Sequence, residues 1–292
     1  MFDLFKISKK YIESQFQKHG FSNKTIDIDD YQIQYWDNNK NGKTILLLHG
    51  FGAQAEFQWY KQIESLSKEF RVIVPNLLHF GDSKPKNKPL YTLNDQAQMV
   101  NSLMGFLEID LFHLAGISYG GLVSMAFYVE NKPKVEKVIL IDSPVKFFSQ
   151  DDLNRICKQY KVPSIIDFFA PKNYAVLRKQ IAASYYFPLF IPSFITKNLY
   201  EKMCLPNIEV WEKLILDLLE NMDFYASNDY RTDCPTLLIW GEKDDIIPLK
   251  IGQQLNEYFD NSTLVVIPRT KHLPNLERAK LVNKAITTFL RL

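Results

Sequence analysis

Six short runs of apolar residues recur along the chain and are separated by longer amphipathic stretches. A strand that is apolar on both sides needs a layer of helices on each face of its sheet, as parallel sheets have. The runs cover residues 44–48, 71–75, 112–116, 138–141, 236–240 and 264–267. Residues 56–70, 92–108 and 276–290 place apolar side chains at helical spacing. This alternation predicts an α/β protein with a doubly wound, mostly parallel sheet flanked by helices.

Two segments depart from the alternation. Residues 25–37 alternate polar and apolar side chains, which is typical of antiparallel strands at a sheet edge and brings the expected sheet to eight strands. Residues 144–226 contain no strand pattern, and they hold 15 of the 40 aromatic residues. We interpret them as a helical cap over the carboxyl edge of the sheet, where open α/β folds bind ligands. The predicted division is a helical extension (1–24), a core (25–143 and 227–292) and the cap (144–226).

Composition narrows the class of protein. The 35 Lys and Arg residues nearly balance the 33 Asp and Glu residues, so we expect no nucleic-acid partner. Three scattered cysteines (Cys157, Cys204 and Cys234) predict neither a disulfide framework nor a metal site. Neither a run of 18 apolar residues nor a secretory signal is present, so a cytoplasmic protein is expected.

The strongest chemical motif is Gly-Ile-Ser-Tyr-Gly at residues 116–120. It lies between a predicted strand and a predicted helix, which is the setting of a nucleophile elbow. In such an elbow a strained, tight turn projects the serine oxygen above the sheet, and small neighbours prevent clashes with the backbone. Ser118 is therefore the candidate nucleophile.

A serine nucleophile needs a general base and a carboxylate that orients it. Of the five histidines, His272 follows the last predicted strand and can reach the carboxyl edge of the sheet. Asp244 follows the preceding strand, and the order Ser118, Asp244, His272 is that of α/β-hydrolases. Adjacent Asp245, and Asp142 in a variant layout, are the alternative acids.

The developing oxyanion requires hydrogen-bond donors. Residues 49–52 (His-Gly-Phe-Gly) follow the strand at 44–48, where backbone N–H groups can turn toward the serine. We expect the N–H groups of Phe51 and Tyr119 to form the oxyanion hole, with His49 bracing the loop.

These motifs resemble the α/β-hydrolase family with a helical cap over about residues 25–292. The stretches beginning at His49 (HGFGAQAEFQWY), Gly116 (GISYGGLVSMAFY) and Leu237 (LLIWGEKDDIIPL) resemble the monoacylglycerol-lipase-like, carboxylesterase branch, and they are similar to the carbon–carbon-bond hydrolases of aromatic degradation. The resemblance implies Ser118 as nucleophile, His272 as base, Asp244 as its orienter, and neither cofactor nor metal. It also implies a glycine before the histidine, where this chain has Lys271, and a structural role for Glu277.

The expected activity is hydrolysis of lipophilic esters through an acyl-enzyme. A serine at the elbow, in place of an aspartate, argues against dehalogenase and epoxide hydrolase chemistry. One alternative is hydrolysis of ring-cleavage diketones, whose carboxylates would need a basic residue in the pocket, with Arg155, Lys158 and Arg178 as cap candidates. Another alternative is a slow-turnover binding protein. The aromatic residues of the cap either cover an apolar acyl or aryl group of the substrate or only pack against one another and stabilise the cap.

Residues 1–20 place Phe2, Phe5, Ile12 and Phe16 near helical spacing among several lysines. Such a helix either lies on a membrane surface or docks on its own domain.

Overall fold

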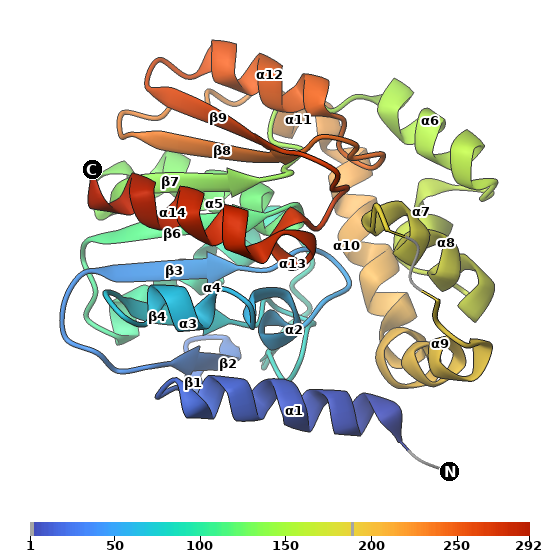
Figure 1. The fold of residues 1–292 in the computed structure, drawn as a ribbon, viewed down its shortest axis with the longest axis horizontal. Helices are drawn as coiled ribbons and strands as arrows, with labels where there is room; N and C mark the ends of the chain where they lie inside the picture. Colours follow the sequence, from blue (N-terminus) through green and yellow to red (C-terminus); the bar gives the residue numbers. More distant parts are fainter. Residues whose placement is uncertain (1–2, 188–189) are drawn as a thin grey trace.

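The computed structural model describes residues 3–187 and 190–292, and it is built on one mixed sheet between two layers of helices (Figure 1). The strands are β1(Ser22–Ile28), β2(Tyr31–Asp37), β3(Thr44–Leu48), β4(Arg71–Pro75), β5(Lys84–Pro85), β6(Phe112–Ile117), β7(Val135–Ile141), β8(Thr236–Gly241) and β9(Ser262–Ile267). The helices of the core and its N-terminal extension are α1(Leu4–Lys18), α2(Ala55–Trp59), α3(Ile63–Leu66), α4(Leu93–Phe106), α5(Tyr119–Asn131), η1(Lys132–Lys134), α12(Leu249–Tyr258), α13(Pro274–Glu277) and α14(Ala279–Arg291).

The strand order β1-β2-β4-β3-β6-β7-β8-β9 confirms the predicted α/β-hydrolase fold, with the eight expected strands on this path and two-residue β5 paired to β2 as a ninth. Strands β3, β4, β6, β7, β8 and β9 pair in parallel, and β1 and β2 form the antiparallel edge predicted for residues 25–37. Because β3 pairs with β4 on one side and β6 on the other, the winding direction reverses between β3 and β6. That switch point is where open α/β sheets bind ligands.

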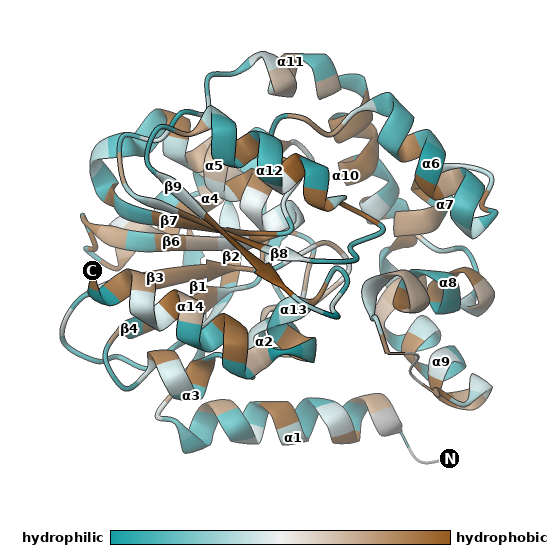
Figure 2. Cartoon of the chain, turned by 45° about the horizontal axis from the view of Figure 1, so that its top comes forward, coloured by the Kyte–Doolittle hydropathy of each residue, from teal (hydrophilic) through white to brown (hydrophobic). Residues whose placement is uncertain are grey.

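The continuous apolar runs are explained by two separate cores. Along β3, Leu46 and Leu48 pack in the core beneath α4, α5 and α12, whereas Ile45 and Leu47 pack in the core beneath α2, α3 and α14. Neighbouring residues of a strand point to opposite faces, so a central strand between two cores is apolar on both of its faces. Figure 2 shows these central strands as predominantly hydrophobic between helices of mixed character.

The helix at 92–108 is confirmed as α4, with Thr92 as N-cap and a capping box to Asp95. The single helix predicted for residues 56–70 is wrong. The segment instead breaks into α2 and α3, with Gln62 as the N-cap of α3. The Gln62 Nε2 donates to the Asn275 carbonyl at 2.8 Å and to Asn283 Oδ1 at 2.9 Å. These tertiary hydrogen bonds accompany the break in a segment whose apolar spacing alone favoured one helix.

The segment between β7 and β8 is helical throughout its ordered elements: α6(Gln150–Tyr160), α7(Ile165–Phe169), α8(Tyr174–Ser184), α9(Ser193–Leu199), η2(Tyr200–Cys204), η3(Leu205–Asn207), α10(Ile208–Glu220) and α11(Met222–Ser227). These helices lie beyond the carboxyl ends of the parallel strands (Figure 1). The division into extension, core and cap remains our proposal for the domain organisation. Among the described residues, no helix combines the length and apolar character that crossing a membrane requires.

Helix α1 packs against the core. Ile12 and Phe16 are buried with Trp36 and Trp59, and the Phe16 ring centroid lies 4.8 Å from that of Trp36. Phe5 stacks on Phe57 at 5.5 Å. Two of the apolar residues considered for membrane contact therefore belong to the core in this structure, and Phe2 lies outside the described residues.

We expect Phe16→Ala to lower the free energy of unfolding by about 3–5 kcal/mol, because it removes a fully buried ring between Trp36 and Phe21. Urea unfolding measures the change. Tyr11→Ala is the matched control, since Tyr11 is on the same helix and 60% exposed. Equal effects of the two substitutions would contradict the docking of α1.

Candidate active site

Ser118 occupies a strained turn between β6 and α5. Its backbone has φ 52° and ψ −120°, a region that L-residues rarely adopt. The turn is possible because its neighbours lack side chains: a Cβ on Gly116 would lie 2.3 Å from the Gly120 carbonyl oxygen, and one on Gly120 would lie 2.4 Å from that of Leu48. The Ser118 amide N–H donates to the Ile141 carbonyl at 2.8 Å, which ties the turn to β7.

The structure brings the three predicted side chains together. Ser118 Oγ lies 2.9 Å from His272 Nε2, and His272 Nδ1 lies 2.7 Å from Asp244 Oδ2. Asp244 and His272 are each only 6% exposed. The arrangement permits transfer of the hydroxyl proton to the imidazole while the carboxylate stabilises the imidazolium. None of the other four histidines, all within the described part of the chain, is hydrogen bonded to Ser118.

The backbone fixes the orientation of Asp244. Its Oδ1 accepts hydrogen bonds from the Ile246 N–H at 2.8 Å and the Ile247 N–H at 3.0 Å, which leaves Oδ2 facing the histidine. The alternative acid Asp245 turns away and pairs with Lys271 at 2.6 Å. The structure therefore places Asp244, and not its neighbour, against His272.

Asp142, the other alternative acid, lies one residue beyond β7 and is fully buried. Its Oδ1 accepts a hydrogen bond from the Gly241 N–H at 2.8 Å, whereas Oδ2 has no partner among the described residues. Burial and the nearby charge of Asp244 raise the pKa of Asp142 well above its usual value. Sequence reasoning considered Asp142 only as an alternative acid and did not anticipate a fully buried carboxyl with one unpartnered oxygen.

The loop after β3 meets the elbow. A Cβ on Gly50 would lie 3.4 Å from Ser118 Cβ, and the rings of Phe51 and Tyr119 are 5.5 Å apart. His49 Nε2 accepts a hydrogen bond from the Leu77 N–H at 2.9 Å, and burial lowers the pKa of His49 to about 4. Its neutral ring thus braces the loop. Within the described residues, neither the Phe51 nor the Tyr119 amide N–H has a hydrogen-bond partner, so both are available to an oxyanion.

Lys271 directly precedes His272, and its charge is offset by Asp245. Glu277 holds the same loop: Oε1 accepts from the Lys271 N–H at 2.8 Å and Oε2 from the Tyr186 N–H at 2.7 Å. Glu277 thereby links the loop that carries the histidine to the segment after α8. These contacts reduce the electrostatic penalty that a lysine at this position would place on a neighbouring imidazolium.

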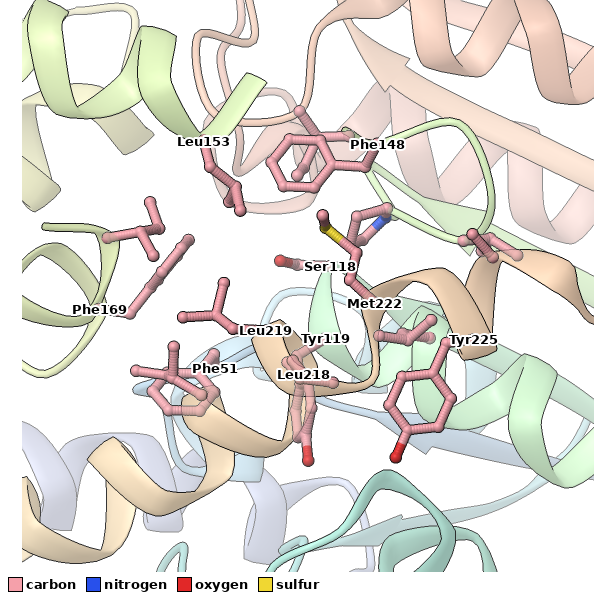
Figure 3. A pocket seen from close by; sticks show the side chains of 17 residues that line it. Phe51, Ser118, Tyr119, Phe148, Leu153, Phe169, Leu218, Leu219, Met222 and Tyr225 are labelled. Atoms are coloured by element: carbon pink, nitrogen blue, oxygen red, sulfur yellow. The ribbon is translucent and has the colours of Figure 1, made fainter. Parts of the chain in front are cut away.

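An apolar pocket of about 120 Å³ opens beside Ser118 (Figure 3). The Ser118 hydroxyl faces it, and residues of the cap, including Leu153, Phe169 and Leu219, surround the opening. Among the described residues, no charged side chain lines this pocket. Cap aromatics thus divide: Phe148 and Phe169 line the pocket, while Phe187 and Phe194 are exposed.

The three cationic cap residues lie away from this pocket. Arg155 donates to the carbonyl oxygens of Asp245 at 2.6 Å and Ile246 at 3.2 Å, so it ties α6 to the acid loop. Lys158 is exposed, and Arg178 lines a separate pocket with Lys271. In the described part of the chain, no group of three or more His, Cys, Asp or Glu side chains could hold a metal ion.

Comparison with known proteins places this geometry in a family. A sequence model of the alpha/beta hydrolase fold matches residues 43–279. Lipase 3 of Moraxella sp. is 22% identical, over 94% of this chain and 86% of that protein. The 2-hydroxy-6-oxo-2,4-heptadienoate hydrolase of Pseudomonas putida is 26% identical, over 85% of this chain and 89% of that protein. Haloalkane dehalogenase 2 of Mycobacterium tuberculosis is 29% identical, over 88% and 90%.

The fold is also found in solved structures. A candidate lipase from Acinetobacter baumannii superposes with a TM-score of 0.85 at 21% identity, covering 97% of this chain and 95% of that one. At this identity the likeness concerns the fold and not the reaction.

We expect Asp142→Asn to raise the melting temperature at about pH 7. The folded-state pKa of Asp142 lies above the unfolded value of about 4, so folding is penalised as pH rises past that value. Below about pH 4 the carboxyl is protonated in both states, and the two proteins should melt alike. Thermal melting across this range measures the difference. Asp245→Asn, which removes an ion-paired carboxylate, should not stabilise the protein, and a destabilised Asp142→Asn at neutral pH would contradict this account.

Proposed function

Because this chain belongs to the α/β-hydrolase family, we propose that it is a serine hydrolase that cleaves carboxylic esters of lipophilic acyl groups. The observation that carries this proposal is the continuous hydrogen-bonded chain from Ser118 Oγ through His272 to Asp244. This geometry is the one that serine acyl transfer needs, with the nucleophile, its base and the orienting carboxylate in contact before substrate binds.

In the proposed reaction, Ser118 Oγ attacks the ester carbonyl while His272 Nε2 accepts its proton. The N–H groups of Phe51 and Tyr119 stabilise the oxyanion. The imidazolium then protonates the departing alcohol, which leaves an acyl group on Ser118. His272 next removes a proton from water, which attacks the acyl carbon; the bond to Ser118 Oγ then breaks, the imidazolium returns the proton to Ser118 Oγ, and the acid is released. Asp244 keeps the imidazole oriented throughout.

The substrate class is inferred from the pocket. Its lining is apolar apart from the hydroxyls of Ser118, Tyr119 and Tyr225, so a hydrocarbon chain gains free energy by leaving water there. The similarity to Lipase 3 of Moraxella sp. also supports a lipophilic ester as the substrate. Monoacylglycerols and similar lipophilic esters are the substrates we propose.

Two alternatives are weaker. A ring-cleavage hydrolase, as in the Pseudomonas putida relative, would bind carboxylate groups, but the described lining of the pocket that Ser118 faces offers no cation, and Arg178 and Lys271 line a separate pocket that Ser118 does not line. A slow-turnover binding protein has no need of the hydrogen-bonded chain at Ser118. The dehalogenase relative does not alter the proposal, because a serine and not a carboxylate occupies the elbow.

Hydrolysis of p-nitrophenyl esters from acetate to palmitate tests the proposed activity. We expect hydrolysis to be fastest for medium or long chains, because the pocket stabilises apolar acyl groups. Ser118→Ala should lower kcat by about 10⁴-fold or more. Release of p-nitrophenol measures both. The absence of serine-dependent release at every chain length would reject the ester hydrolase proposal.

A substitution in the pocket tests which cavity holds the acyl chain. Leu219→Trp should shift the preference toward shorter esters, because Leu219 lines the apolar pocket and the larger ring fills it. The matched control is Leu216→Trp, which makes the same change at a position on α10 that is 39% exposed. The chain-length profile of each variant is compared with that of the wild type. An unchanged profile in Leu219→Trp would place the acyl chain elsewhere.

A further inference from the structure

A second pocket, of about 300 Å³, lies between the cap and the loop that carries His272. Arg178 and Ala182 of α8, Tyr185, Thr196 of α9 and Lys271 are among the residues that line it. It shares no lining residue with the apolar pocket. Because Lys271 is covalently next to His272, this pocket flanks the histidine side of the site, whereas the apolar pocket flanks Phe51 and Tyr119.

Helix α8 connects this pocket to the rest of the site. A Cβ on Gly52 would lie 3.9 Å from Gln180 Nε2, so α8 passes close to the loop that carries the candidate oxyanion donor Phe51. Two residues further on, the Ala182 carbonyl accepts a hydrogen bond from Lys271 Nζ at 3.4 Å. The same stretch of α8 therefore contacts both the loop after β3 and the side chain that precedes His272, and its residues Arg178 and Ala182 line the second pocket.

The charged lining of the pocket is cationic. Arg178 and Lys271 contribute its charged side chains, and no carboxylate lines it among the described residues. Lys271 is paired with Asp245, so part of its charge is already balanced. Arg178 is exposed, donates to Ser193 Oγ at 3.1 Å and to the Ile191 carbonyl at 3.4 Å, and forms no ion pair with a described acidic residue. Its guanidinium keeps further N–H donors for a ligand with acceptor oxygens.

Thr196 supplies an independent sign of a ligand. The residue lines the pocket and is 0% exposed, and its Oγ1 has no hydrogen-bond partner within the described residues. A buried hydroxyl without a partner costs free energy that an acceptor would recover. Burial also raises the pKa of Tyr185 to about 12, so its phenol remains a donor at neutral pH. The pocket is thus rich in donors.

We infer that this second pocket binds an oxyanion, a phosphate or a carboxylate, on the alcohol part of the ester, while the acyl chain occupies the apolar pocket. The inference rests on the proposed ester hydrolysis and narrows its substrates to acyl esters of an anionic alcohol. Arg178 is the principal ligand of the anion. In this proposal the acyl group extends from Ser118 into the neutral apolar pocket, and the alcohol part extends past His272 toward the cationic pocket that Lys271 lines.

The test compares three esters of one acyl chain: 1-decanoylglycerol, 1-decanoylglycerol 3-phosphate and 3-decanoylglycerate. We expect the kcat/KM of the wild type to be higher for one of the two anionic esters than for the neutral ester. Arg178→Met should lower the ratio of anionic to neutral kcat/KM by about tenfold to a hundredfold, the range for a lost hydrogen bond to a charged group, chiefly through KM. Whether the phosphate or the carboxylate ester responds identifies the anion. Lys158→Met, an exposed cap lysine outside the pocket, is the charge-matched control and should leave the ratio unchanged.

Calorimetric titration of Ser118→Ala with inorganic phosphate tests the pocket without turnover, and adding Arg178→Met should abolish the binding heat. If all three esters are hydrolysed but Arg178→Met leaves their ratio unchanged, the anion subsite is rejected and ester hydrolysis stands. If Ser118-dependent hydrolysis is absent for every ester, the proposed function fails, and with it the assignment of this anion to a substrate.

Discussion

The strained backbone at Ser118 is the constraint on which the site depends. A residue at φ 52° and ψ −120° is held there only if the surroundings leave it no alternative. Here the amino end of α5 is pressed against the end of β3, so closely that Gly120 has no room for a Cβ beside the Leu48 carbonyl. That contact requires β3 and β6 to be neighbours in the sheet. The position of the nucleophile above the sheet therefore depends on the strand order.

The histidine is positioned by a comparable close approach at the other side of the sheet. A Cβ on Gly241 would lie 1.9 Å from the Lys271 carbonyl oxygen, so the loop before His272 lies directly on the end of β8. The Lys243 N–H donates to the Thr270 carbonyl at 2.9 Å, which joins the acid loop to the histidine loop. Asp244 and His272 thus share one rigid unit formed by β8 and β9. Ser118 belongs to another, formed by β6 and α5, and β7 lies between them.

The sequence predicted the parallel strands from their apolar runs, and it predicted Ser118, Asp244 and His272 from the elbow motif, the positions after strands and the residue order of the resembled family. Contacts between distant segments were not visible in that pattern. The hydrogen bonds from Gln62 accompany a break in the helix expected at 56–70. Arg155 and Arg178 have the same residue type in the same cap, yet one braces the acid loop and the other lines a pocket. Only tertiary structure distinguishes them.

The two sides of the candidate active site differ in charge. On the side of Phe51, burying hydrocarbon excludes water, and no described charge lines that surface. On the side of His272, a lysine replaces the glycine expected from family resemblance, and Asp245 pairs with it while Asp244 pairs with the imidazole. The two consecutive carboxylates therefore have separate partners. Because Asp245 offsets the charge of Lys271, this lysine can precede the histidine without strongly opposing the imidazolium that ester cleavage requires.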